Sequence, residues 1–360
     1  MTVEFVGMIR TADTSEIRPA RGPAVDVDYT RRFAQAHEEA GFDRVLIGYH
    51  SWDADGFAVA GHAAAHTERL GFLLAHRPGF VAPTLAARKL ATLDQFTGGR
   101  LAVHIISGAS ETEQRKDGDY ADKQERYRRT DEYLDVVKRI WSADEPVDHD
   151  GEFYRFAGAR SDVRPVAGSL PVYFGGSSQD AYRVGGKHAD VYALWGEPLA
   201  ETALQIAAVK ESARLHGRDP DDIGISVSFR PILGRSDEEA WERAHRILAT
   251  IEAQKGPAGA MLNFPAAERG VGSQRLLDAA DKSDLHDRAL WTATAKATGA
   301  AGNSTALVGS PETVAKALLD YVDIGVTTIL IRGFDPLEDV VDYGKHLLPL
   351  VRSELAVPTA

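Results

Sequence analysis

The chain has 360 residues, of which 44% are hydrophobic and 26% are charged, a balance that is typical of a globular protein. Its 53 acidic residues outnumber its 41 basic ones, and the formal net charge of −12 argues against nucleic acid or an anionic membrane as a partner. The chain contains no cysteine, which excludes disulfides, thiolate nucleophiles and cysteine-ligated metal sites.

The N-terminal residues MTVEFVGMIR lack the basic flank and long apolar run of a signal peptide. No apolar stretch elsewhere in the chain approaches the roughly 20 residues that cross a bilayer. We therefore expect a cytoplasmic protein that does not contact a membrane.

Short apolar runs alternate with amphipathic stretches along the whole chain, the order that is typical of parallel α/β proteins. Runs with the length of buried strands cover residues 3–9, 42–47, 71–75, 101–106, 171–174, 191–195, 223–232 and 327–332. Helical spacing or helix-start signals follow them, for example over residues 28–41, 83–97, 125–141, 199–217, 236–252 and 311–324. The alternation predicts a single α/β domain over residues 1–360, a (β/α)8 TIM barrel with insertions, with an open doubly wound sheet as the alternative.

Three segments interrupt this alternation. Residues 109–124 are polar and too long for a simple connection, and residues 148–156 have the pattern of a small hairpin that turns at Asp150 and Gly151. Residues 253–304 are rich in glycine and alanine and carry only patches of helical spacing. Their position and composition suit either a lid over the barrel or a static cover.

Polar side chains gather where several of the expected strands end, and in parallel α/β folds this edge is where ligands bind. They are His50, Trp52 and Asp53 after the second strand, His76 and Arg77 after the third, and His104 and Ser107 at the fourth. Taken singly, each histidine is more often a structural residue, and none has the HExxH spacing of a metal site. We therefore predict no metal site.

The sharpest local signal is the sequence Phe174-Gly175-Gly176-Ser177-Ser178. Glycines at a strand end, followed by hydroxyl side chains at a helix start, expose backbone N–H groups to an anion such as a phosphate. The simpler interpretation is that the glycines form the turn and Ser177 caps the helix, and the spacing alone favours neither. The sequence contains no GxGxxG or Walker motif, which argues against a separate dinucleotide-binding domain.

Arg230 lies within an apolar strand, so it requires an anionic partner if it is buried. That partner is either a substrate anion or a neighbouring carboxylate, and the sequence does not separate the two. The last strand ends in Arg332 and Phe334, which add a charge and an aromatic ring to the same edge. Arg126 and Tyr127 open the helix over residues 125–141, where capping or surface roles are the simpler interpretations.

Together these stretches resemble the bacterial-luciferase-like flavin monooxygenases, in particular the alkanesulfonate monooxygenase branch. The resemblance rests on ATLDQFTGGRL, VHIISG, QERYRRTDEYLDVVKRIW, GEFYRF, PVYFGGSSQDA, WGEP and STALVGSPETVA, which occur in one order over nearly the whole chain. It implies a (β/α)8 barrel that receives FMN as FMNH2 from a separate NAD(P)H-dependent flavin reductase. It further implies O2 as co-substrate, a flavin peroxide that oxygenates a small organic molecule, and a homodimer or homotetramer. In the alkanesulfonate enzymes the reaction cleaves the C–S bond and gives an aldehyde and sulfite.

The resemblance assigns the cofactor side of the site with few changes. The FMN phosphate would lie at Gly176, Ser177 and Ser178, and further flavin contacts would come from Ser107, Tyr127 and Trp195. His104 stands where these enzymes usually carry asparagine, so its flavin contact is altered.

The substrate side departs from the sulfonate pattern. The Arg and His of the sulfonate enzymes match Ser226 and Ser228, their cysteine falls near Trp52 or Asp53, and the Arg of their mobile loop falls near Thr298. The tyrosine after their last strand is Phe334 here. We assign catalytic roles at the substrate to His50, Trp52, Arg230 and Phe334, and an anion clamp would have to come from Arg230, Lys296 or Arg10.

A sulfonate requires charge-assisted hydrogen bonds to leave water cheaply, so the missing cations favour a neutral or differently charged substrate. A sulfone or a heterocycle is therefore an alternative to an alkanesulfonate. Two further alternatives are a deazaflavin-dependent oxidoreductase of the same superfamily and a non-catalytic flavin-binding barrel.

Overall fold

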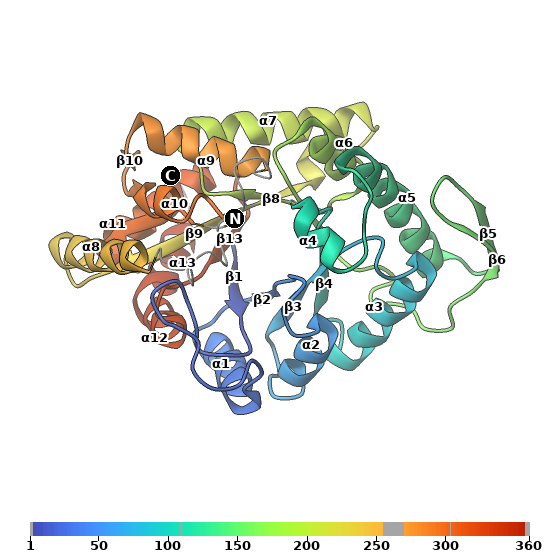
Figure 1. Cartoon of the computed structure of the whole chain (residues 1–360), viewed down its shortest axis with the longest axis horizontal. Helices are drawn as coiled ribbons and strands as arrows, with labels where there is room; N and C mark the ends of the chain where they lie inside the picture. The colour runs from blue at the N-terminus through green and yellow to red at the C-terminus, as the bar shows by residue number, and fades with distance from the viewer. Residues whose placement is uncertain (1–2, 109, 255–269, 303, 357–360) are drawn as a thin grey trace.

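The computed structural model describes residues 3–108, 110–254, 270–302 and 304–356. Parallel strands lie at the centre of the molecule and helices surround them (Figure 1). The barrel strands are β1 (Glu4–Ile9), β2 (Arg44–Ile47), β3 (Gly71–His76), β4 (Leu101–Ile105), β7 (Val172–Gly175), β8 (Val191–Trp195), β9 (Gly224–Leu233) and β13 (Thr328–Ile331). The sheet closes because β9 pairs with β8 and with β13, and β13 pairs in turn with β1. The predicted (β/α)8 barrel is confirmed, and the open doubly wound sheet is excluded.

The helices pack their apolar faces on the outside of the barrel. They are α1 (Val27–Glu39), α2 (Gly56–Ala64), α3 (Pro83–Thr97), α5 (Lys123–Ser142), α6 (Gln179–His188), α7 (Leu199–Leu215), α8 (Asp237–Ala253), α11 (Pro311–Asp323), α12 (Pro336–Asp342) and α13 (Leu348–Ala356), with a π-helical turn at Tyr343–Leu347 and a short 3₁₀ helix, η1, at Pro220–Asp222. Among the described helices, none combines the length and the apolar composition that crossing a bilayer requires.

The interior of the barrel has its own apolar layer, formed by Val6, Leu73, Ala102 and Tyr173. Neighbouring strand residues, such as Phe5 and Phe72, face outward into the main core instead. This alternation follows from the two-residue period of a strand. Residues two positions further along the strands therefore face the interior again, nearer to the C-terminal ends. At these positions stand Met8, Ala75, His104, Gly175 and Ala193, most of which have short side chains.

The described part of the insertion at residues 253–304 is more regular than its sequence predicted. Residues 255–269 and 303 lie outside the described residues. The described part contains α9 (Val271–Lys282), β10 (Leu285–His286), β11 (Leu290–Trp291) and α10 (Ala293–Ala297). β11 pairs with β12 (Ala306–Gly309), which in turn runs parallel to the last residues of β9.

The sequence did not predict β12, because its three apolar residues, Ala306 to Val308, directly follow a glycine-rich and alanine-rich segment. The polar segment at residues 109–124 contains a further short helix, α4 (Glu111–Lys116), which the sequence also did not predict. The predicted hairpin is present as β5 (Val147–Asp150) and β6 (Arg155–Ala159).

Candidate active site

The turn between β7 and α6 is shaped by a glycine that admits no side chain. Gly176 has a φ of +141°, and a Cβ added there would lie 2.7 Å from the Cβ of Ala181. Ser178 is the N-cap of α6, since its Oγ accepts a hydrogen bond of 3.2 Å from the Ala181 N–H. The cap is thus Ser178 and not Ser177, which leaves the Ser177 hydroxyl without a capping role.

Two tyrosine hydroxyls hold this turn in place. The Tyr192 hydroxyl donates a 2.8 Å hydrogen bond to the Gly176 carbonyl, which ties that oxygen to the core. The Tyr127 hydroxyl, at the start of α5, lies 3.5 Å from Ser178 Oγ. Burial raises the pKa of Tyr127, so its hydroxyl remains a neutral hydrogen-bond donor at physiological pH. Tyr127 is not a cap, because Asp122 and Glu125 form the capping box of α5.

The first turn of α9 (Val271–Lys282) lies beside Ser177. A Cβ at Gly272 would approach the Trp195 ring to 3.1 Å and Ser177 Oγ to 3.5 Å, so α9 packs closely against both residues at this glycine. The N-termini of α6 and α9 therefore meet near Ser177. The N-terminal end of a helix carries partial positive charge and unpaired N–H groups, and two such ends together favour an anion.

A buried ion pair fixes α9 in this position. Glu197, which follows β8, accepts hydrogen bonds of 2.6 to 3.0 Å from Nε and Nη2 of Arg275 on α9. The Glu197 side chain is 2% exposed, and its backbone carbonyl accepts a 2.7 Å hydrogen bond from the Tyr321 hydroxyl. The sequence did not predict this pair, because the two residues lie 78 positions apart and no local spacing links them.

His104 occupies the barrel interior next to the turn. A Cβ at Gly175 would lie 3.6 Å from its Cε1, and its Nδ1 is buried with no hydrogen-bond partner in the part of the chain that the structure describes. Burial lowers the pKa of His104 to about 4, so the imidazole is neutral at physiological pH. A buried polar atom without a partner is costly, and a ligand that supplies the missing hydrogen bond removes that cost.

Ser107 lies where β4 ends and is held by α5. Its Oγ is 3.2 Å from the Thr130 hydroxyl, and its carbonyl accepts a 3.1 Å hydrogen bond from Arg126 Nε. The predicted cofactor residues thus lie at the ends of three consecutive barrel strands, β4, β7 and β8, and on α5. The arrangement suits a ligand with a phosphate at the turn and a hydrogen-bonding ring near His104.

The second-loop residues His50, Trp52 and Asp53 lie together at the surface. His50 Nδ1 is 2.7 Å from Asp53 Oδ2, and the imidazole stacks on the Trp52 ring with 4.9 Å between centroids. Trp52 is 43% exposed, and the ammonium of Lys116 lies 5.2 Å from its ring centroid.

The third-loop residues His76 and Arg77 have protein partners. Nε2 of His76 lies 2.6 Å from the Tyr133 hydroxyl, outside the barrel. Arg77 forms a buried ion pair of 2.8 Å with Glu113 of α4 and lies over the Tyr49 ring. Both side chains therefore connect elements of the fold.

Arg230, on β9, is buried and already paired. Its Nη1 lies 2.8 Å from Glu16 Oε2, and its Nη2 donates a 2.8 Å hydrogen bond to the Gly333 carbonyl. The Phe334 ring, 1% exposed, lies 3.5 Å from the centre of the guanidinium. Of the two partners that the sequence left open for Arg230, the structure supplies the neighbouring carboxylate.

The other candidates for an anion clamp differ in position. Lys296 is exposed and forms an ion pair of 2.9 Å with Asp281 on α9. The Thr298 hydroxyl donates a hydrogen bond to the Thr294 carbonyl at the end of α10. Arg10 follows β1. Burial and the like charge of Arg332 lower the pKa of Arg10, although the carboxylates of Glu16 and Asp53 oppose them. Glu16 is a site residue that the sequence did not predict, since it lies in a long loop without periodicity.

Comparison with known proteins places this geometry in context. A family model described as luciferase-like monooxygenase matches residues 8–328. The chain is similar in structure to a riboflavin lyase solved with modified FMN and riboflavin, with a TM-score of 0.81 and 20% identity over 100% of this chain and 93% of that one. It is also similar to DmoA from Hyphomicrobium sulfonivorans (TM-score 0.78, 21% identity, 100% and 90% covered) and to the EDTA monooxygenase of Chelativorans sp. BNC1 (0.80, 18%, 99% and 95%). At these identities the solved structures show a shared fold.

Proposed function

The chain belongs to the luciferase-like monooxygenase family, and from this we propose that it is the oxygenase component of a two-component, FMNH2-dependent monooxygenase. It would receive reduced FMN from a separate NAD(P)H-dependent flavin reductase and use O2 to oxygenate a small organic substrate. The observation that carries the proposal is the turn at Gly176, Ser177 and Ser178, where two helix N-termini meet two serine hydroxyls.

The residues present fit FMN at both of its polar ends. The turn can hold the phosphate, because Gly176 has no side chain to cover the backbone there. In addition, the Tyr192 hydroxyl ties the Gly176 carbonyl to the core. The buried Nδ1 of His104 can form a hydrogen bond to the ring. His104, which stands where the resemblance implies an asparagine, therefore supports a ligand with polar atoms in its ring system.

Reduced FMN, when bound, supplies the electrons with which O2 is activated. The chain's own residues bind and orient the flavin and keep water away from it. The first turn of α9 packs beside Trp195 and Ser177, and it covers this side of the connection between β7 and α6. The candidate lid at residues 253–304 would act through this contact, and the homodimer or homotetramer remains a prediction from the resemblance.

An ¹⁸O2 assay tests the proposed reaction. The protein is combined with NADH, FMN, a flavin reductase and a panel of alkanesulfonates, sulfones and heterocycles, and products are analysed by mass spectrometry. We expect one ¹⁸O atom in the product of at least one substrate class, and no product without the reductase. Sulfite release from several alkanesulfonates would assign the chain to that branch.

A different result of the same assay would contradict the proposal. If the protein binds reduced FMN but yields neither product nor peroxide beyond what free reduced FMN gives, the chain is a flavin-binding barrel and not an oxygenase.

A further inference from the structure

A carboxylate of the chain itself lies between two arginines at the C-terminal end of the barrel. Glu16 Oε2 is 2.8 Å from Arg230 Nη1, and Glu16 Oε1 is 3.0 Å from Arg332 Nη2. The side chains of Arg230 and Glu16 are 1% and 9% exposed. Burial alone would raise the pKa of Glu16, but the two guanidiniums outweigh it and hold the pKa well below its ordinary value. Glu16 is therefore ionised throughout the physiological pH range.

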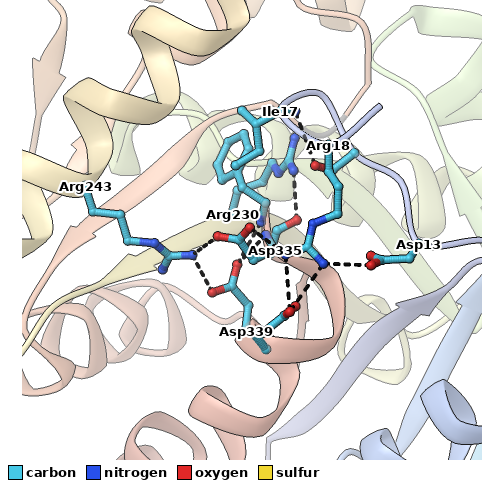
Figure 2. Close-up of polar contacts among 11 residues, drawn as sticks. Asp13, Ile17, Arg18, Arg230, Arg243, Asp335 and Asp339 are labelled. Atoms are coloured by element: carbon cyan, nitrogen blue, oxygen red, sulfur yellow. Dashed lines mark hydrogen bonds and ion pairs between the residues drawn. The ribbon is translucent and has the colours of Figure 1, made fainter. Parts of the chain in front are cut away.

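Glu16 belongs to the first loop, residues 10–26, which is fixed on both sides of this carboxylate. Backbone hydrogen bonds join Ser15 and Arg18 around it. Arg18 then reaches Asp335 at 3.0 Å and Asp13 at 2.7 Å (Figure 2). Ile17 packs against the apolar cluster that contains Phe334.

The base of this arrangement is fixed by α8. Arg243 approaches Asp335 and Asp339 from the side opposite Arg18, at 2.9 and 2.6 Å (Figure 2). The Asp339 carboxylate in turn accepts hydrogen bonds from the backbone N–H groups of Phe334 and Asp335. The loop that carries Glu16 is thus held to the segment after β13 by several ion pairs.

Two guanidiniums that converge on one carboxylate form the usual protein site for an external carboxylate, sulfonate or phosphate. Arg230 follows Ser226 and Ser228 at two-residue spacing on β9, so it faces the same side of the strand. The resemblance to the sulfonate enzymes places the substrate at these two serines. An anionic substrate group at this end of β9 would have to displace Glu16.

We propose that Glu16 determines substrate specificity: its carboxylate takes the place of a substrate anion between Arg230 and Arg332, so that the site favours substrates without a carboxylate, sulfonate or phosphate at that end. The claim about substrate specificity rests on the proposed function, whereas the anion site itself does not. Removing the Glu16 carboxylate should convert the two arginines into a site for an external anion.

Anion rescue tests the site without any enzymatic assay. The thermal unfolding midpoint of Glu16→Ala is measured with increasing acetate or methanesulfonate, at constant ionic strength maintained with chloride. We expect Glu16→Ala to have a lower unfolding midpoint than the wild type, and we expect these anions to raise it again. The dissociation constant of the anion should be about tenfold or more lower for Glu16→Ala than for the wild type. The matched control is Glu338→Ala, which removes an exposed carboxylate that contacts Arg18 at 3.3 Å in the same network, and whose midpoint should not respond to these anions.

A Glu16→Ala protein that folds only when acetate or methanesulfonate is present supports the proposal. If Glu16→Ala and the milder Glu16→Gln show no more response to these anions than the wild type, the proposal is overturned. It is also overturned if the wild type already binds methanesulfonate as tightly as Glu16→Ala does.

The specificity claim is tested next, by comparing alkanesulfonates with neutral sulfones in the oxygenation assay. Glu16→Gln should gain about tenfold in relative kcat/KM for the sulfonate, and no gain would overturn the claim. If neither protein oxygenates any compound while Glu16→Ala still binds anions, the proposed function fails and the anion site stands.

Discussion

Replacing Ser177 or Ser178 with alanine should weaken FMN binding in both cases but lower stability in only one. A hydrogen bond to a charged group contributes about 1.5–3 kcal/mol, so each substitution should raise the dissociation constant of FMN by about tenfold or more. Ser178→Ala also removes the N-cap of α6, which should cost about 1 kcal/mol in the free energy of unfolding. Ser177→Ala removes no cap and should leave stability unchanged.

Fluorescence titration with FMN and urea unfolding of the flavin-free protein measure these two effects separately. Ser236→Ala is the matched control, because Ser236 caps α8 through the Glu239 N–H at 3.3 Å and lies on another strand–helix connection. It should lose about 1 kcal/mol of stability with unchanged affinity for FMN. If both turn variants bind FMN as tightly as the wild type does, the phosphate lies elsewhere.

Replacing Arg275 with methionine should both destabilise the protein and release α9 from the turn. The substitution leaves the Glu197 carboxylate, 2% exposed, without its partner. Breaking a buried pair in this way costs about 3–5 kcal/mol, and we expect the lower end because Arg275 is partly exposed and Glu197 can take up a proton. Hydrogen exchange over α9 should become faster, and FMN affinity should fall, since Gly272 contacts the surroundings of Ser177.

The pH dependence of this variant has a defined sign. Burial already raises the pKa of Glu197 against the opposing effect of Arg275, and the loss of Arg275 raises it further. A carboxyl whose pKa is higher in the folded than in the unfolded chain stabilises the fold at low pH, and that stability is lost as pH rises. The defect of Arg275→Met should therefore be larger at about pH 8 than at about pH 5.

Lys282→Met on the same helix is the control, because Lys282 forms only an exposed 3.2 Å pair with Glu201. It should change stability by less than about 1 kcal/mol. The double variant Glu197→Gln/Arg275→Met should recover part of the loss, since no buried charge then remains unpaired. An Arg275→Met protein with normal stability and normal exchange over α9 would show that the pair does not hold the helix.

The barrel was predictable from the sequence because each of its strands is a short and mainly apolar run, and most of these runs are followed by helical spacing. β12 and α9 escaped prediction because their apolar residues lie in or beside a glycine-rich and alanine-rich segment. The gathering of polar residues at the strand ends was also predictable, since the ends of parallel strands meet at one edge. His104, Gly176 and Ser178 were thus brought together by topology alone.

The long-range ion pairs were not predictable in the same way. Glu16 reaches Arg230 across more than half of the chain, and Glu197 reaches Arg275 in an insertion, and nothing in either local sequence marks a partner. Such pairs depend on how the loops pack over the barrel and not on the period of any strand or helix. One of them pairs Glu16 with Arg230, the arginine that the sequence offered as an anion clamp.

An anaerobic titration of the protein with reduced FMN, reduced riboflavin and a reduced deazaflavin cofactor tests whether this barrel holds a flavin phosphate. If the turn at Gly176–Ser178 holds the FMN phosphate, reduced FMN should bind about tenfold or more tightly than reduced riboflavin, and Ser177→Ala should narrow that difference. Equal affinities for FMN and riboflavin, or binding of the deazaflavin alone, would contradict the assignment of this barrel as an FMNH2-dependent monooxygenase.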